Sequence, residues 1–314
     1  MQKRLLAKKL KKGDTIGIIA PSFEVSEEAF ESYEYAKAFF EKKGFNIKTG
    51  KHIREKWFGS AGEPEKRAED LNDMFCDRDV DAIICLNGGG TSNTMLPFID
   101  FDAIKNNPKI FMGYSDISVL NQVFWQKTGL VTFNGPLFQD FCNAEAAAAY
   151  YSEFEERFIE GKSSLPKDPN SRCVRSGRAS GILVGTNVKC SMNLMGTPYQ
   201  VDYTDKILAL EAWGISNYEC AVRFSQLKQS GVFDKVRGIV VGYVYALQDE
   251  RATEGKRLDQ MEDILADILK DKDIPILKYN KFGHEMINAI IPIGTEVSID
   301  ADRCEIEING SFIE

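Results

Sequence analysis

Ser115 stands where an apolar segment gives way to a helical pattern, the position at which α/β folds present a nucleophile. Residues 110–112 are apolar, Gly113 and Tyr114 follow them, and residues 117–127 have the spacing of an amphipathic helix. A strand that turns sharply into a helix holds a hydroxyl above the sheet edge and directs the first helical N–H groups at whatever the hydroxyl attacks. Because Ile117 replaces the second glycine of G-x-S-x-G, that motif is not met, and a helix N-cap is the alternative role of this serine.

A serine nucleophile needs a base, and the chain contains only two histidines, His52 and His284. His284 follows Gly283 in a loop beyond the apolar run 274–277. A loop histidine of near-neutral pKa can reach across a domain interface, take a proton and return it. His52 lies in a run of charged residues, and we expect it to be a solvated surface residue.

Two acidic residues lie beside these candidates. Glu211 follows the apolar run 207–210, and a carboxylate at the end of a buried strand is costly unless it has a partner such as a histidine N–H. A helix N-cap or a surface acid is the alternative for Glu211. Asp116 follows the serine directly, where an acid in the first turn of a helix is favoured by the helix dipole.

Three consecutive glycines, Gly88, Gly89 and Gly90, follow the apolar run 82–85. Their backbone can approach a ligand closely and direct N–H groups at an anion or an oxyanion. The segment has neither the Gly-Lys-Ser/Thr ending of a P-loop nor the G-x-G-x-x-G spacing of a dinucleotide site. A phosphate site and a plain flexible loop are the alternatives.

The elements that must position these residues follow an alternating pattern in the first half of the chain. Strands are predicted at 15–20, 45–48, 82–85, 110–112 and 130–133, and helices lie between them, the first from an N-cap at Ser26 to Gly44. This alternation predicts an α/β fold with a mostly parallel, Rossmann-like sheet flanked by helices. Ligands bind such sheets at the carboxyl ends of their strands.

The second half predicts a separate α/β domain rich in β-strands. Strand-like runs lie at 181–184, 206–210 and 238–244, an apolar helical stripe at 258–269, and an alternating pattern over 291–308 predicts a β-hairpin. Residues 161–180 are polar and lack apolar periodicity, which is typical of a linker. We therefore expect a nucleophile-bearing domain at 1–160, a linker at 161–180 and a second domain at 181–314.

Composition restricts the partners and the compartment. The net charge is −8 and no basic block stands out, so neither nucleic acid nor an anionic membrane is expected as a partner. The first residues lack the apolar region of a signal peptide and no later run has membrane-spanning length, so we expect a cytoplasmic protein. Seven scattered cysteines favour free thiols over a disulfide framework or a zinc site.

The serine turn, the glycine run and the segments around Glu211 and His284, taken together, resemble those of the LD-carboxypeptidase family of serine peptidases. This family includes murein tetrapeptide carboxypeptidases and microcin C immunity proteins. The stretches 89–102, 107–110 and 113–116 look like the immunity branch in particular. The stretches 185–187, 196–199, 231–238 and 282–284 are similar to signatures of the family's second domain.

The resemblance implies a Ser-His-Glu triad divided between the domains. Ser115 would attack, His284 would act as general base and then acid, and Glu211 would hold the useful tautomer of the imidazole. The backbone N–H of Asp116 and one N–H of the glycine run, that of Gly89, would form the oxyanion hole.

The resemblance also implies the ligand and the assembly. Gly88, Gly90 and Asn187 would contact the substrate, which is a small peptide or a peptidyl-nucleotide. No metal or organic cofactor is implied, and a homodimer is expected. The implied activity is removal of a terminal amino acid from a muropeptide, with hydrolysis of microcin C-type antibiotics as the alternative. A catalytically silent protein that holds a peptide in the same cleft is a second alternative.

Overall fold

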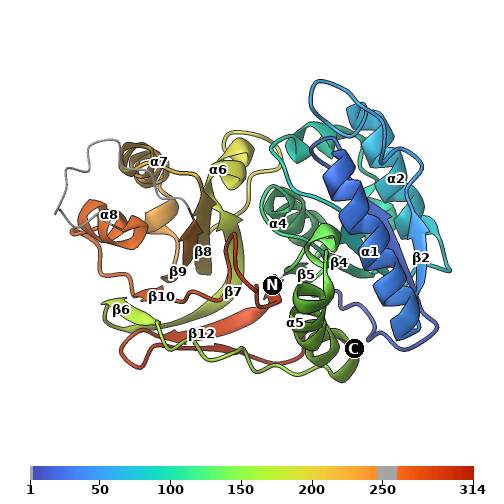
Figure 1. Ribbon diagram of the computed structural model, residues 1–314. Helices are drawn as coiled ribbons and strands as arrows, with labels where there is room; N and C mark the ends of the chain where they lie inside the picture. The colour runs from blue at the N-terminus through green and yellow to red at the C-terminus, as the bar shows by residue number, and fades with distance from the viewer. Residues whose placement is uncertain (1–2, 246–259) are drawn as a thin grey trace, which may run out of the picture.

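The computed structural model describes residues 3–245 and 260–314, whose strands form two sheets (Figure 1). The first sheet has the order β11-β5-β4-β3-β1-β2. Neighbouring strands are parallel except β11, which runs antiparallel to β5. This confirms the predicted parallel α/β architecture. The strands of the first sheet are β1 (Thr15–Ile19), β2 (Asn46–Thr49), β3 (Ala82–Cys85), β4 (Ile110–Met112), β5 (Thr132–Asn134) and β11 (Ile291–Ile293).

The first helix, α1, begins and ends at the capping residues that its sequence predicts. The Ser26 hydroxyl accepts a hydrogen bond from the Ala29 N–H at 3.1 Å, and Gly44 ends the first helix with a φ of 97°. The helices around the first sheet are α1 (Glu27–Lys43), α2 (Pro64–Cys76), α3 (Phe101–Asn106), α4 (Ile117–Thr128), α5 (Ala144–Phe154), the π-helical turn Glu155–Glu160, and the 3-10 turns Ser92–Phe98 and Phe138–Asp140.

Both faces of the first sheet are buried at its central strands β1, β3 and β4, which explains why these strands are apolar runs without alternation. Along β3, Ile83 and Cys85 pack into one hydrophobic cluster, whereas Ala82 and Ile84 pack into the other. Successive side chains of a strand point to opposite faces, so each face receives every second residue. Helices must therefore cover the sheet on both sides, as Figure 1 shows for α1 and α4.

The second sheet has the order β13-β12-β7-β8-β9-β10-β6. Its central strands β7 to β10 are parallel, and antiparallel strands close both edges. The strands are β6 (Arg172–Arg175), β7 (Arg178–Asn187), β8 (Lys206–Trp213), β9 (Gly238–Tyr245), β10 (Ile276–Lys278), β12 (Glu296–Asp300) and β13 (Glu305–Ile308), with helices α6 (Val188–Ser191), α7 (Asn217–Gln229) and α8 (Met261–Ile268) and the 3-10 turns Met192–Leu194 and Val232–Asp234.

Two segments differ from the sequence-based expectation, and a third extends beyond the described residues. Residues 161–180, expected to be a linker, include β6, which pairs with β10 at the edge of the second sheet. The hairpin is confirmed as β12 and β13, but β11 at its predicted start lies in the first sheet. The predicted helix over 258–269 is α8, and residues 258–259 lie outside the described part of the chain. None of the helices in the described residues combines the length and the apolar character needed to cross a membrane.

The two sheets share one packed interior. Helix α4 and strand β11, which belong to the first sheet's layers, both contact β7 of the second sheet. Each hydrophobic cluster contains residues of both sheets, for example Ile83 with Leu208 and Ile84 with Ala209. The carboxyl ends of β3, β4, β7 and β8 are consequently held in a fixed relation to one another.

Phe40 on α1 is the centre of an aromatic cluster that packs this helix against α5 and the segment before it. Its ring is fully buried and lies 4.9 Å from Phe141 and 5.3 Å from Phe154, centroid to centroid. We expect Phe40→Ala to lower the free energy of unfolding by about 3–5 kcal/mol, because it removes a buried ring and leaves a cavity. Urea denaturation measures this change. Phe58→Ala is the matched control, since Phe58 is 90% exposed, and a comparable loss in both variants would contradict the assignment.

Candidate active site

Ser115 occupies the turn between β4 and α4 in a strained backbone conformation. Its φ is 62°, in the left-handed region that costs a non-glycine residue about 1–3 kcal/mol. The turn is closed by hydrogen bonds from the Ile117 N–H to the Tyr114 carbonyl at 3.2 Å and from the Ser118 N–H to the Ser115 carbonyl at 3.1 Å. The serine is thus presented as a nucleophile would be, which the strand-turn-helix pattern predicts.

Two glycines make room for this turn. A Cβ atom on Gly113 would lie 2.9 Å from the Ile117 side chain, so the turn can be this tight only with glycine there. A Cβ atom on Gly88 would lie 3.2 Å from the Ser115 hydroxyl. The glycine run therefore passes directly beside the hydroxyl, and a backbone N–H of this run is available to a group that the hydroxyl attacks.

Glu211 lies near the end of β8, where the pairing with β9 is irregular. Leu210 pairs with Val241, whereas Ala212 pairs with Val244, so β9 contains a bulge opposite Glu211. Bulges redirect side chains and are frequent beside active sites. The Glu211 side chain is only 1% exposed, and its Oε2 lies 2.9 Å from His284 Nδ1. Glu211 is therefore the buried partner of a histidine and not a surface acid.

The loop that carries His284 is fixed to the same bulge. The Tyr243 N–H donates to the Phe282 carbonyl at 2.7 Å, and the Gly283 N–H donates to Asn288 Oδ1 at 2.7 Å. Gly283 has a φ of 150°, and a Cβ atom there would lie 2.4 Å from the Tyr243 carbonyl oxygen. The loop thus approaches β9 as closely as only glycine permits, which places the imidazole beside Glu211.

His284 also lies against the nucleophile turn. Its ring meets the Tyr114 ring edge-on, with 4.9 Å between the centroids, and Tyr114 precedes Ser115 directly. The hydrogen bonds among the described residues include none between the Ser115 hydroxyl and His284. Such contacts are often long before substrate binds and tighten in the complex. The structure thus places the Glu211–His284 pair beside Tyr114, the residue that precedes Ser115.

Charges around the imidazole favour its protonated form. Burial lowers the pKa of His284, but the charge of Glu211, its hydrogen bond, and the charges of Asp140 and Glu285 together raise this pKa above 6.5. Asp140 ends the turn Phe138–Asp140 and accepts a hydrogen bond from the Leu137 N–H at 2.9 Å. Desolvation raises the pKa of Asp140 to about 7. Sequence reasoning missed Asp140, because nothing in its local pattern indicates proximity to a histidine more than a hundred residues away.

The remaining predicted residues surround the same site. Gly89, with a φ of 152°, packs against Ser22 and Phe23, while Gly90 is exposed. Asn187 at the end of β7 pairs with Glu211 across the sheet, and its Oδ1 accepts a hydrogen bond from the Cys190 N–H at 3.1 Å. The side-chain oxygen of Asn187 therefore caps a helix.

The prediction for His52 is wrong. His52 is buried, its Nδ1 lies 2.7 Å from Glu55 Oε1, and its backbone N–H donates to Asp70 Oδ2 at 3.0 Å. The charged neighbours that indicated a solvated run instead enclose the ring. No site residue contacts His52 among the interactions of the described residues, so His284 is the histidine of the site.

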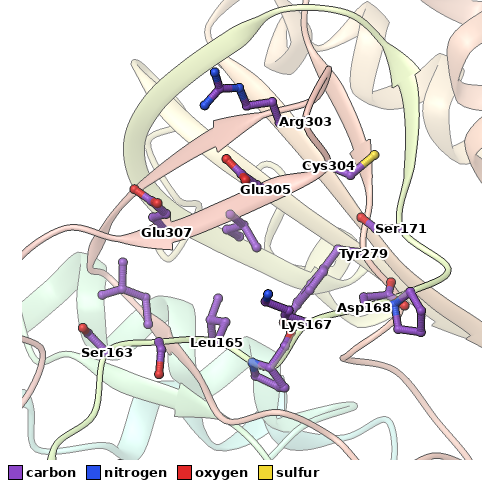
Figure 2. A pocket seen from close by; sticks show the side chains of 15 residues that line it. Ser163, Leu165, Lys167, Asp168, Ser171, Tyr279, Arg303, Cys304, Glu305 and Glu307 are labelled. Carbon is purple, nitrogen blue, oxygen red and sulfur yellow. Dashed lines mark hydrogen bonds between the residues drawn. The ribbon is translucent and has the colours of Figure 1, made fainter.

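Two of the larger cavities among the described residues lie outside the triad itself. One, of about 740 Å³, extends from Asp140 and Glu285 to the start of α1. The other, of about 780 Å³, lies between residues 163–171 and β13, where Glu305 and Glu307 extend from the strand (Figure 2). The second cavity contains none of the predicted site residues. Within the described chain, no group of His, Cys, Asp and Glu side chains could hold a metal ion.

Comparisons with known proteins find relatives over nearly the whole chain. The chain is 32% identical over 298 residues to the "Probable murein peptide carboxypeptidase" of Bacillus subtilis, covering 93% of this chain and 91% of that protein. It is 29% identical over 338 residues to the "Microcin C7 self-immunity protein MccF" of Escherichia coli, covering 98% and 97%.

Solved structures show the same fold. MccF in complex with aspartyl sulfamoyl adenosine is similar with a TM-score of 0.90 at 28% identity, covering 99% of this chain and 100% of that one. A muramoyltetrapeptide carboxypeptidase from Oxalobacter formigenes is similar in fold, with a TM-score of 0.81 at 22% identity, covering 96% and 100%.

Two family domains match consecutive parts of the chain. Residues 16–135 match the LD-carboxypeptidase N-terminal domain, which contributes Ser115 and the glycine run. Residues 180–299 match the LD-carboxypeptidase C-terminal domain, which contributes Glu211 and His284. The chain therefore belongs to the LD-carboxypeptidase family of serine peptidases.

Proposed function

We propose that this protein is a serine L,D-carboxypeptidase that removes a terminal D-amino acid from a muropeptide, as in murein recycling. The observation that carries the proposal is the buried Glu211–His284 hydrogen bond, held beside the Ser115 turn by the Tyr114 ring. Membership of the LD-carboxypeptidase family and similarity to a murein peptide carboxypeptidase support the substrate class.

Acylation begins when the Ser115 hydroxyl attacks the carbonyl carbon of the scissile amide. His284 Nε2 accepts the hydroxyl proton, because its Nδ1–H donates to Glu211 and leaves the Nε2 lone pair free. The oxyanion accepts hydrogen bonds from the backbone N–H groups of Asp116 and Gly89. The C–N bond then breaks, and the proton on His284 passes to the departing amine.

Deacylation reverses these roles. Water attacks the acyl-enzyme while His284 Nε2 takes one of its protons, and the second tetrahedral intermediate collapses to release the shortened peptide and restore the Ser115 hydroxyl. The backbone of Gly88 and Gly90 and the side chain of Asn187 contact the substrate. Both half-reactions pass through an imidazolium, which the negative charges of Glu211, Asp140 and Glu285 stabilise.

A second candidate activity is hydrolysis of aminoacyl-nucleotide antibiotics, which would confer resistance. The observation that favours it is Trp213, whose ring is 52% exposed and lies 6.5 Å from the His284 ring. The leaving group departs on the side of the histidine that protonates it, so an exposed indole there offers a surface on which a nucleobase stacks.

We infer that the protein works in the cytoplasm as a homodimer. All seven cysteines are free thiols, which supports a reducing compartment. Similarity to a family whose members are usually dimers supports the assembly. Light scattering of the protein as it elutes from a size-exclusion column measures its mass. A mass of about 35 kDa, that of a single chain, would contradict the dimer.

Ser115→Ala should lower the release of D-alanine from an L,D-tetrapeptide by at least about a thousandfold in kcat, because no other group can form the acyl-enzyme. A D-amino acid oxidase assay measures the release. Ser152→Ala, which changes an exposed serine on α5, should leave the rate unaltered. If the wild type hydrolyses a processed microcin C analogue and not the tetrapeptide, the second candidate activity is selected. If Ser115→Ala hydrolyses its substrate as fast as the wild type, Ser115 is not the nucleophile.

Glu211→Gln should lower the pKa of His284. The carboxylate stabilises the charged imidazolium; without it, burial dominates and favours the neutral ring. NMR titration of histidine labelled at Cε1 measures the pKa, with His52→Gln to assign the two resonances. Asp140→Asn should lower it by a smaller amount, because Glu211 exerts the stronger effect.

In the wild type, kcat/KM should accordingly fall on the acid side with a midpoint above pH 6.5. A His284 pKa that is the same in wild type and Glu211→Gln would contradict the coupling between the two residues.

A further inference from the structure

The carboxylate of Asp116 lies between the nucleophile turn and the glycine run. Asp116 is fully buried, and its Oδ2 accepts hydrogen bonds from the Ser22 hydroxyl at 2.6 Å and from the Ser92 N–H at 2.7 Å. The Ser92 hydroxyl donates in turn to the Asp116 backbone carbonyl at 3.0 Å. One residue of the turn is thus bonded to Ser92, which follows the glycine run, and to Ser22, which packs against Gly89.

Ser22 passes this restraint to the glycine run itself. While its hydroxyl donates to Asp116, its oxygen accepts a hydrogen bond from the Thr91 N–H at 3.2 Å. The run also packs directly on this side chain, since a Cβ atom on Gly89 would lie 2.3 Å from the Ser22 oxygen. The position of Gly89 relative to the turn is therefore set through Ser22 and Asp116.

A buried cation restrains the other side of the same loop. Arg67 of α2 is 1% exposed and donates to the Pro21 carbonyl at 2.6 Å, to the Thr91 carbonyl at 3.3 Å and to the Thr94 hydroxyl at 2.7 Å. Burial lowers the pKa of Arg67, and the charge of Asp116 opposes that effect. A buried charge is costly unless it is compensated, so the carboxylate and the guanidinium favour the loop conformation that keeps them close.

Helix capping does not account for the Asp116 side chain. It makes no capping hydrogen bond to the first turn of α4, although an acid at this point of the sequence is typical of one. Its hydrogen bonds run instead to Ser22, which packs against Gly89, and to Ser92, which follows the glycine run.

We propose that the Asp116 carboxylate is a positioning residue that sets the spacing between the two backbone donors of the oxyanion hole, the N–H of Asp116 and that of Gly89. This inference rests on the proposed function. An oxyanion hole acts through donors held in place before the charge develops, and a displacement of about 1 Å can cost about a hundredfold in rate. The carboxylate therefore acts on kcat without touching the substrate.

Asp116→Ala tests this role with the L,D-tetrapeptide as substrate. We expect kcat to fall about a hundredfold while KM changes little, because the lost interaction concerns the transition state. Affinity for a peptide boronic acid, which forms a tetrahedral adduct on serine, should fall in parallel. Asp116→Asn should restore part of kcat, because an amide oxygen can accept the same two hydrogen bonds but does not supply the charge that compensates Arg67.

The matched control is Asp100→Ala, which removes a carboxylate that accepts the Ala103 N–H at 2.9 Å at the start of α3. It should lower the melting temperature and leave kcat unchanged. If Asp116→Ala does not fold, Ser22→Ala removes only one bond to the carboxylate and should still lower kcat with KM retained.

Two results separate the failures. If Ser115→Ala is inactive but Asp116→Ala keeps the wild-type kcat and boronate affinity, the positioning role is overturned. Ser22→Ala takes the place of Asp116→Ala in this test if Asp116→Ala does not fold. Activity in Ser115→Ala would overturn the proposed function itself.

Discussion

The hydrogen bond between Glu211 and His284 is the interaction on which the candidate site depends. A carboxylate that is 1% exposed is stable only with a partner, and the imidazole N–H at 2.9 Å supplies one. Removing one member of a buried pair typically costs about 3–5 kcal/mol, so the loop that carries His284 is held to the second sheet by the site's own chemistry. The bulge in β9 and the close approach of Gly283 are the backbone features that let the two side chains meet.

The turn that carries Ser115 lies beside this pair only because the two sheets pack together. The nucleophile turn belongs to the first sheet, whereas Glu211 and the bulge that holds the His284 loop belong to the second. Strand β11 comes shortly after His284 and pairs with β5, so the segment that carries the histidine is anchored in both sheets. The shared hydrophobic clusters leave the two halves little freedom to separate, and the strained φ of Ser115 persists because its surroundings determine it.

Features that depend on local pattern could be predicted from the sequence. The apolar runs of the first sheet, the cap at Ser26 and the turn at Ser115 each follow from neighbouring residues. Features that depend on distant pairing could not. Strand β6 lacks apolar alternation, and the alternation of β11 does not reveal that it pairs with β5 and not with the hairpin. The burial of His52 results from tertiary contacts that its charged neighbours do not reveal. The family resemblance supplied the partner of Glu211, which the residues alone left open between a histidine and solvent.

The most direct test of the account is to trap the acyl-enzyme. The L,D-tetrapeptide is mixed with the protein, the reaction is stopped with acid within the first turnover, and tryptic peptides are analysed by mass spectrometry. The account predicts an added acyl group, equal in mass to the tetrapeptide without its D-alanine, on Ser115 in the peptide 110–127. D-alanine release with no covalent intermediate, or with the acyl group on another residue, would contradict it.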